Sequence, residues 1–275
     1  MKKLIFQMSD KERKILSRNE YLNIEREFHD KYSKTLNWDS PVTEYFSYED
    51  DSLDSEKLQS YFDLKLGNVV EKKILDIGSG FGNSALNLAK RGAIVTSIDI
   101  SPRLIEGCRY RAAKNGLVLN FQVMDAGNLH FDENYFDIIL SFRTIHHLPI
   151  LEDFFKEAYR CLKPGGFILI VEPQKFNPFV EFGRKFIRNS ESSRTPTEHP
   201  LIPADIRIFR SIFYNIENHE FIFLSAASRF FNLLKLKKVY NYSAKFLSKI
   251  DELLWHIRFL RPFYWQVVLK GYKTM

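Results

Sequence analysis

Residues 73–82 read KILDIGSGFG, and this segment is the strongest local signal in the chain. Its apolar first half predicts a β-strand over 73–77, and glycines follow directly at the alternating positions 78, 80 and 82. Glycine allows positive φ angles and the close approach of a ligand to the backbone. A helix predicted at 83–91 would then present its free N–H groups to a polar or anionic ligand. The stretch therefore predicts a strand, a ligand-binding turn and a helix in immediate succession.

Beyond this turn, short apolar runs alternate with segments of helical periodicity. We predict helices at 102–115 and 151–162, and strands at 94–98, 119–124, 136–142 and 167–172. Strands that alternate with helices of this length are typical of an α/β fold, a Rossmann-like parallel sheet with helices on both faces. Two later apolar runs, 219–224 and 264–269, are expected to add two more strands.

The chain divides into three parts by charge. Residues 1–69, with a net charge of −3, are predicted to form an N-terminal helical cap, with helices at 9–30 and 54–66. Residues 70–173 have no net charge and are predicted to form the cofactor-binding core. Residues 174–275 carry 17 basic and 8 acidic side chains and 20 of the 41 aromatic residues. We expect this last part, at +9, to bind the acceptor and to contain the last two strands with a helical insertion between them.

Composition narrows the function classes. Hydrophobic residues make up 45% of the 275 residues and charged residues 27%, so the chain can bury a sizeable core. The apolar run in the opening residues MKKLIFQ is too short for a secretory signal, and no uncharged apolar stretch is long enough to cross a membrane. Cys108 and Cys161 lack metal-ligand spacing, which predicts neither a metal site nor a disulfide framework. These features favour a cytoplasmic protein.

Two classes of cofactor compete for the glycine turn. A dinucleotide fingerprint, GxGxxG, needs a small third residue at the position of Asn83. Asp76, two residues before the first glycine, would repel a pyrophosphate but suits the ammonium group of an amino-acid-bearing cofactor. Asp99 ends the second predicted strand, where it fits a ribose diol in either class. Asp125 ends the third strand, where it could accept a hydrogen bond from the exocyclic amine of adenine.

Five motifs in order carry a resemblance to a known family. They are residues 76–82, Asp99, Asp125-Ala126, the FDIILS run at 136–141 and the LKPGG run at 162–166. Together they resemble the class I S-adenosylmethionine-dependent methyltransferases. The resemblance implies a seven-stranded sheet in which the last strand is antiparallel, and S-adenosyl-L-methionine as the cofactor.

The resemblance also implies a role for each motif. Asp76 and the backbone of residues 78–82 would hold the methionine end of the cofactor, Asp99 the ribose hydroxyls, and Asp125 with Ala126 the adenine. The fourth strand would close the site with its last two residues. The predicted cofactor-binding residues are Asp76, Gly78, Ser79, Gly80, Phe81, Gly82, Asp99, Ile100, Asp125, Ala126, Ser141 and Phe142.

Three residues are candidates for catalysis. His146 and His147 follow the fourth strand at the mouth of the predicted site, and a histidine titrates near neutrality and could remove a proton from the acceptor. Either ring could instead hydrogen-bond the backbone at the start of the next helix. Glu172 ends the fifth strand at the same edge, as a catalytic or a structural carboxylate.

Two further histidines lie outside the core. His29, in the EFHD segment 27–30, resembles a position in some small-molecule methyltransferases where the N-terminal segment covers the cofactor; a solvated helix face is the alternative. His199, beside Pro200 in a polar loop, is a candidate residue of a lid over the site.

The acceptor is predicted from the end of the fourth strand and from the basic last part. Amine-methylating enzymes of nucleic acids carry an Asp/Asn-Pro-Pro-Tyr motif where this chain reads SFRT at 141–144, which argues against nucleic acid. The segment from Tyr242 to Leu260 has apolar residues at helical spacing beside lysines and arginines. It is expected to form either a lid over the active site or a contact with the inner membrane surface.

We therefore expect a methyltransferase that acts on oxygen or carbon of a bulky apolar or lipid-linked small molecule. A cytoplasmic location, with peripheral membrane contact as an addition, fits this reading, and no obligate protein partner is expected. The rival hypotheses are an NAD-dependent oxidoreductase and a non-catalytic, cofactor-binding protein that docks on membranes.

Overall fold

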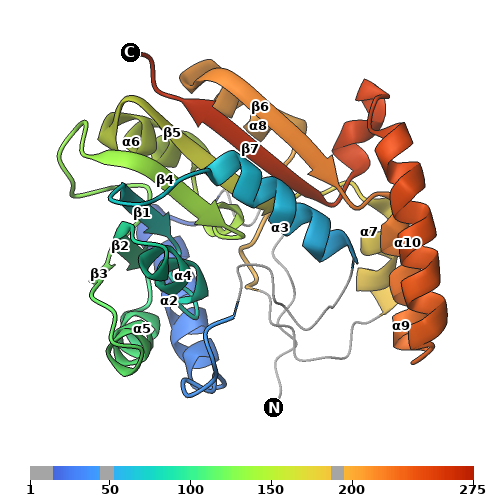
Figure 1. The fold of residues 1–275 in the computed structure, drawn as a ribbon, viewed down its shortest axis with the longest axis horizontal. Coiled ribbons are helices and arrows are strands. Elements are labelled where there is room, and N and C mark those ends of the chain that lie inside the picture. Colours follow the sequence, from blue (N-terminus) through green and yellow to red (C-terminus); the bar gives the residue numbers. More distant parts are fainter. Residues whose placement is uncertain (1–14, 44–52, 187–194) are drawn as a thin grey trace.

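The computed structural model describes residues 15–43, 53–186 and 195–275 (Figure 1). One seven-stranded sheet runs through it in the order β3-β2-β1-β4-β5-β7-β6. Strands β1 to β5 pair in parallel, and β7 is antiparallel to both of its neighbours. The predicted seven-stranded fold is thus confirmed. The strands are β1 (Lys73–Ile77), β2 (Ile94–Asp99), β3 (Asn120–Val123), β4 (Phe136–Phe142), β5 (Leu162–Pro173), β6 (Tyr214–Phe221) and β7 (Gln266–Tyr272).

Helices cover both faces of the sheet. One buried cluster joins α3, α4 and α5 to one face, and a second joins α6 and α8 to the other. Figure 1 shows α7, α9 and α10 grouped beyond β6, away from α2, α4 and α5. The helices are α2 (Arg18–Ser33), α3 (Leu53–Leu66), α4 (Asn83–Lys90), α5 (Pro102–Lys114), α6 (Leu151–Cys161), α7 (Pro178–Phe186), α8 (Pro203–Ile212), α9 (Arg229–Leu233) and α10 (Lys237–Leu254). Short 3₁₀ turns are η1 (Ile145–His147), η2 (Leu224–Ser228) and η3 (Arg258–Phe263).

The central strands are apolar because both of their faces are covered. Ile74 belongs to the cluster under α3, α4 and α5, whereas Leu75 and Ile77 belong to the cluster under α6 and α8. Parallel strands covered on both sides read as continuous apolar runs. Since β1, β2, β4 and β5 all run the same way, their carboxyl ends meet at one edge of the sheet. That edge is where ligands bind in open α/β folds.

The bounds of some helices and strands differ from those predicted. Helix α2 begins at Arg18, after a capping box formed by Ser17 and Glu20, and residues 9–14 of the helix predicted at 9–30 lie outside the described residues. Strand β6 begins at Tyr214, five residues before the predicted start, because it is an edge strand with half-exposed polar residues and no apolar run. Helix α7 was not predicted.

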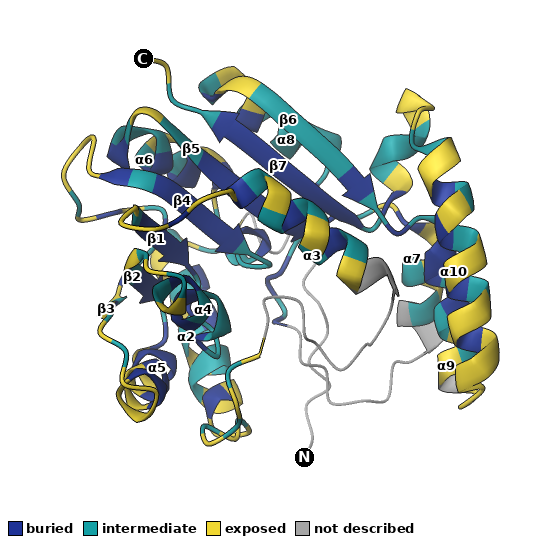
Figure 2. Cartoon of the chain, in the orientation of Figure 1, coloured by how far each residue is buried: buried dark blue, intermediate teal, exposed yellow. Residues whose placement is uncertain are grey.

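The predicted helix at 242–260 is instead α10, which begins and ends earlier, and its apolar stripe faces outward. Its buried side consists of Tyr240, Ala244, Ser248 and Asp251. Tyr242, Phe246 and Leu253, three residues of the predicted apolar face, are 79%, 59% and 73% exposed. Figure 2 shows the exposed residues along the outer side of α10. Small and polar residues pack against η2 because Asp251 accepts hydrogen bonds from the backbone there.

Candidate active site

The glycine turn between β1 and α4 has the positive φ angles that its glycines allow. Gly78, Gly80 and Gly82 have φ angles of +81°, +49° and +83°. A Cβ atom on Gly78 would lie 2.1 Å from Thr144 Oγ1, so the segment before η1 packs directly on this glycine. A Cβ atom on Gly80 would find no heavy atom closer than 4.0 Å. The backbone at Gly80 is therefore open to a ligand.

Backbone hydrogen bonds hold the turn against β2. The N–H groups of Gly78 and Ser79 donate to the Ile98 carbonyl over 2.8 and 2.9 Å. Asp99 accepts a hydrogen bond from the Gly80 N–H at 3.0 Å and another from the Ser101 N–H at 2.9 Å. Burial raises the pKa of Asp99, and the nearby His29 opposes that shift. Each Asp99 oxygen keeps a lone pair with which it could accept a further hydrogen bond.

Asp76 lies beneath the turn and is almost fully buried. Its two carboxylate oxygens accept hydrogen bonds from the hydroxyls of Ser84, at 2.8 Å, and Ser97, at 2.6 Å. The Ser97 hydroxyl also lies 2.7 Å from that of Ser79. Burial raises the pKa of Asp76 to about 6, although the two serine hydrogen bonds act in the opposite direction.

The raised pKa of Asp76 predicts that the affinity for the cofactor depends on pH. Above pH 6 the Asp76 carboxylate is ionised and would favour the ammonium group in the predicted contact, and below pH 6 it takes up a proton and would lose that attraction. We expect the Kd for S-adenosylhomocysteine to rise about tenfold from pH 7 to pH 5. Calorimetric titrations across this range measure it. Asp76→Asn should flatten the profile, and an equally steep profile in that variant would contradict the assignment.

Ser141, on β4, indicates whether these residues fit the predicted cofactor. Within the described residues, the fully buried Ser141 Oγ has no hydrogen-bond partner. Ser141 pairs with Ile77 in the sheet, directly beside the glycine turn. An unpaired hydroxyl next to an open glycine backbone suits a ligand rich in amino and hydroxyl groups, so the residues fit S-adenosylmethionine. The adjacent Phe142 packs on Phe62, with ring centroids 4.5 Å apart.

The remaining predicted cofactor residues lie at the ends of β2 and β3. Ile100 is half-buried and Ala126 is buried. Asp125 accepts a hydrogen bond from the Gly127 N–H at 2.9 Å and forms an ion pair with Arg18 at 2.7 Å. Arg18 also reaches Asp153 at 2.8 Å and so ties α2 to this end of the site. The adenine contact of Asp125 stays a prediction.

An arginine that the sequence reading missed supports the outer side of the turn. The Arg111 guanidinium stacks on the Phe81 ring, 3.8 Å from its centroid, and donates hydrogen bonds to the Phe81 carbonyl and, at 2.9 Å, to the Asn83 side chain. Trp38 packs on the same phenylalanine. Arg111 is fully buried on the apolar face of α5, and an arginine at that helical position was the signal that could have revealed it.

Glu172 and His146 form a buried pair at the carboxyl edge. Glu172 Oε1 accepts hydrogen bonds from the backbone N–H groups of Thr144, at 2.7 Å, and Ile145, at 2.8 Å. Glu172 Oε2 lies 2.6 Å from His146 Nδ1. Burial raises the pKa of Glu172 to about 7 and lowers that of His146 well below its usual value. Glu172 therefore fixes both the η1 turn and the orientation of the imidazole.

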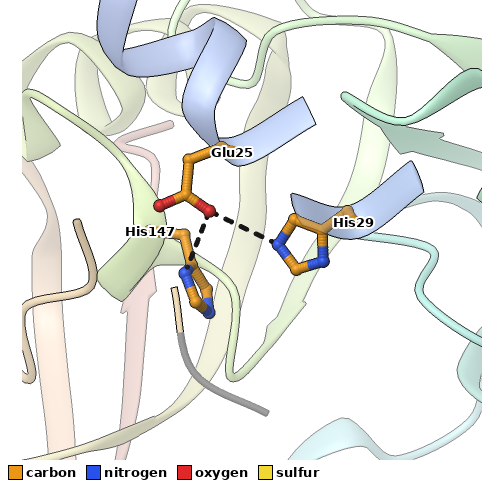
Figure 3. Close-up of side chains that lie close together, drawn as sticks. All are labelled: Glu25, His29 and His147. Carbon is orange, nitrogen blue, oxygen red and sulfur yellow. Dashed lines mark ion pairs between the residues drawn. The ribbon is translucent and has the colours of Figure 1, made fainter. Parts of the chain in front are cut away.

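His147, the third catalytic candidate, faces the N-terminal helix. Its Nδ1 lies 3.3 Å from Glu25 Oε2, and His29 Nε2 lies 3.4 Å from the same oxygen (Figure 3). The hydroxyl of Thr195 lies 3.0 Å from His147 Nδ1 and donates to the other oxygen of Glu25. None of these contacts was predicted, because Glu25, His29 and His147 come from two distant parts of the chain.

The two outlying histidines lie near the site in different ways. The EFHD segment places Asp30 within 2.5 Å of the Ser101 hydroxyl, two residues after the predicted ribose-binding Asp99. His199 donates its backbone N–H to the His146 carbonyl at 2.8 Å, and its ring lies 2.7 Å from the Leu148 carbonyl. His199 therefore holds the segment after β4 in place, while its role as a lid stays a prediction.

The chain is similar to known proteins over part of its length. Residues 75–170 match a family model described as "Methyltransferase domain". Residues 75–170 thus carry a methyltransferase domain. A demethylmenaquinone methyltransferase of Tropheryma whipplei is 34% identical over 157 residues, 56% of this chain and 62% of that protein. A ubiquinone biosynthesis O-methyltransferase of Coxiella burnetii is 38% identical over 95 residues, 34% of this chain and 41% of that protein.

The chain matches less than two thirds of the length of either relative.

Among solved structures, the [4+2]-cyclase SpnF superimposes with a TM-score of 0.62 and 18% identity over 91% of this chain and 95% of that one. Likeness at that identity shows the fold alone. The methyltransferase match supports S-adenosylmethionine as the cofactor, which the family resemblance implied, and the dinucleotide hypothesis finds no support in these comparisons.

Proposed function

We propose that this protein transfers a methyl group from S-adenosylmethionine to oxygen or carbon of a bulky, apolar small molecule. The observation that carries the proposal is the His146–Glu172 pair, placed beside the glycine turn. Thr144 packs on Gly78, and η1 with His146 follows it directly. A hydroxyl or carbon acid must lose a proton when it is methylated, so a base next to the cofactor is the group that this reaction requires.

The chain's own residues have distinct parts in this proposed mechanism. When bound, the cofactor supplies an electrophilic methyl group on a sulfonium. Glu172 Oε2 accepts the Nδ1 proton of His146, which leaves Nε2 as the nitrogen that can take the acceptor's proton. Within the described residues, Nε2 has no hydrogen-bond partner of its own. His146 is thus the proposed base and Glu172 a positioning residue.

The proposed acceptor class follows from the relatives and the composition of the last part. The printed names of the two relatives place them in menaquinone and ubiquinone biosynthesis, and both names imply lipophilic ring substrates. The aromatic-rich residues 174–275 of this chain suit an acceptor of that kind. We propose an electron-rich ring that bears a hydroxyl group and a hydrophobic tail.

A labelling experiment tests this function. The protein is incubated with methyl-tritiated S-adenosylmethionine and, separately, a prenylated naphthohydroquinone, a prenylated catechol and a total lipid extract. We expect a labelled, lipid-soluble product whose mass shows one added methyl group, and much less label with Asp99→Asn at the same cofactor concentration. Binding of S-adenosylhomocysteine with no labelling of any acceptor would support the non-catalytic alternative, and an isomerised product without label would point to a reaction such as cyclisation.

We also propose that α10 rests on an anionic membrane surface from which the acceptor is taken. Its outward stripe exposes Tyr242, Phe246 and Leu253, and residues 229–261 carry eight basic against two acidic side chains. An exposed apolar stripe flanked by lysines is the pattern of helices that lie in the interface of anionic bilayers. Within the described residues, no helix has the length and apolar content needed to cross a bilayer.

Vesicle binding tests this contact. We expect the double variant Tyr242→Asp, Phe246→Asp to bind phosphatidylglycerol vesicles at least about tenfold more weakly than the unchanged protein in a sedimentation assay, because it buries less apolar surface and adds negative charge. Val118→Asp is the matched control, since Val118 is 97% exposed at a different part of the surface. Equal binding of all three proteins, or no binding of any, would refute the membrane contact.

A further inference from the structure

Three possible metal-ligand atoms lie close together in a cluster formed by Glu25, His29 and His147. Glu25 Oε2, His29 Nε2 and His147 Nδ1 all lie within 4.8 Å of each other. Figure 3 shows both rings turned toward the same carboxylate oxygen. That oxygen is buried, and within the described residues it has no hydrogen-bond partner of normal geometry. Its contacts within the described residues are the two ion pairs to His29 and His147, both longer than a normal hydrogen bond, so it is less well satisfied than a fully hydrogen-bonded carboxylate oxygen.

The distances suit a bound cation better than a pair of hydrogen bonds. A charge-assisted N–H···O bond spans about 2.7–2.9 Å, whereas the two rings lie 3.3 and 3.4 Å from Glu25 Oε2. In a tetrahedral site with metal–ligand bonds of about 2.0–2.2 Å, neighbouring ligand atoms lie about 3.3–3.6 Å apart. The two distances to Glu25 Oε2 therefore match the spacing of ligand atoms in a coordination shell, and the two histidine nitrogens lie within 4.8 Å of each other.

We propose that these three atoms bind one divalent transition-metal ion, with Zn²⁺ as the reference ion. Two imidazoles and one carboxylate form a donor set that suits zinc and its neighbours in the first transition row. Glu25 and His29 are four residues apart on α2, so one helix face supplies two ligands. His29 and His147 keep side-chain exposures of 24% and 17%, which leaves access for the ion.

The surroundings of Glu25 are those of an oriented metal ligand. Its other oxygen accepts hydrogen bonds from the hydroxyls of Thr195, at 2.9 Å, and Thr197. Such outer contacts fix the direction of a ligating carboxylate. The ion would join α2 to the η1 turn that carries His146 and to the segment at 195–197. It would thus hold the N-terminal helix over the edge where the cofactor binds.

A second set of candidate ligands shares His147. His146, His147 and Glu198 also place one ligand atom each within 4.8 Å. In that set, however, His146 already gives its Nδ1 to Glu172, and the carboxylate without a normal partner is Glu25. The first set is therefore favoured, and variants of Glu25 and Glu198 distinguish the two.

Metal titration of the full chain tests the proposal without any methylation assay. The protein is freed of metal with EDTA, dialysed, and titrated with ZnCl₂ in a calorimeter and with CoCl₂ in a spectrophotometer. We expect one equivalent of Zn²⁺, visible d–d absorption with Co²⁺, and affinities at least about 100-fold lower in Glu25→Gln and His29→Gln, because removal even of an outer contact costs 10–100-fold. His256→Gln, which removes an exposed histidine elsewhere, should bind as the unchanged protein does.

Three results would overturn the proposal. They are no Zn²⁺ binding by the unchanged protein, equal binding by His29→Gln and His256→Gln, or loss of binding in Glu198→Gln with binding retained in Glu25→Gln. Thermal unfolding of each variant checks that it is folded. If Glu25→Gln does not fold, His29→Gln carries the test, because its side chain is a quarter exposed.

Discussion

We expect Asp99→Asn to lower the affinity of the protein for S-adenosylhomocysteine by about 100-fold. In the proposed complex, the carboxylate accepts hydrogen bonds from both ribose hydroxyls while it holds the N–H groups of Gly80 and Ser101. Asparagine has the same shape but no charge, and its NH₂ group can only donate hydrogen bonds, so one of the two acceptor oxygens is lost. Hydrogen bonds to a charged group contribute about 1.5–3 kcal/mol, and about 2.7 kcal/mol corresponds to 100-fold in Kd. Calorimetric titration measures the change.

Asp137→Asn is the matched control for this prediction. Asp137 is a partly exposed aspartate of β4 that pairs with Lys163 and accepts a hydrogen bond from the Lys73 N–H, near the start of the strands. It lies away from the carboxyl edge, so its replacement should leave the Kd unchanged. A loss of less than threefold in Asp99→Asn, with the variant folded, would contradict the assignment of the ribose site.

His146→Gln is expected to lower kcat for the labelled acceptor by about 100- to 1,000-fold, while the Kd for S-adenosylhomocysteine stays unchanged. General-base catalysis by a positioned side chain contributes about 10²–10⁴ in rate, and glutamine cannot take up the proton. Initial rates of label transfer, with calorimetry for the cofactor product, separate the two effects. An unchanged kcat would exclude His146 as the base.

Glu172→Gln tests how the base is positioned. The amide of glutamine would donate a hydrogen bond to His146 Nδ1, which forces the ring proton onto Nε2 and blocks the nitrogen that is meant to accept. We expect kcat to fall about as far as in His146→Gln, with an unchanged KM for the acceptor. The double variant should be no slower than either single one, because the two residues act as a unit. Independent, multiplying effects would indicate a purely structural role for Glu172.

Much of the fold was predictable because its core obeys local rules. The run at 73–82 and the alternation after it predict β1, the glycine turn and the strands up to β5, and the structure confirms them. Strands buried on both faces need long apolar runs, and the tight turn needs glycine, so both features can be recognised in the sequence. Strand β6 was harder to recognise in the sequence, because an edge strand tolerates polar residues.

The outward direction of α10 could not be predicted from its periodicity. The spacing of Tyr242, Phe246 and Leu253 shows that these residues share one face, but not whether that face meets the core or the solvent. The packing against η2 decides it, since Asp251 caps the backbone of that turn and draws the small residues inward. Periodicity defines a face, and only the neighbouring elements determine what covers it.

The sequence by itself determined the class of fold, the cofactor turn and the acids at the strand ends, because each depends on residues that are neighbours in the chain. Only the tertiary structure brought Arg111 onto the turn, bound Glu172 to His146, and gathered Glu25, His29 and His147 around one oxygen. Apart from Glu25 and His29, which are four residues apart on α2, those contacts join residues that lie 26 to 122 positions apart, and loops and helices of any composition could have separated them. Their distances depend on how α2, η1 and β5 pack, which no local pattern encodes.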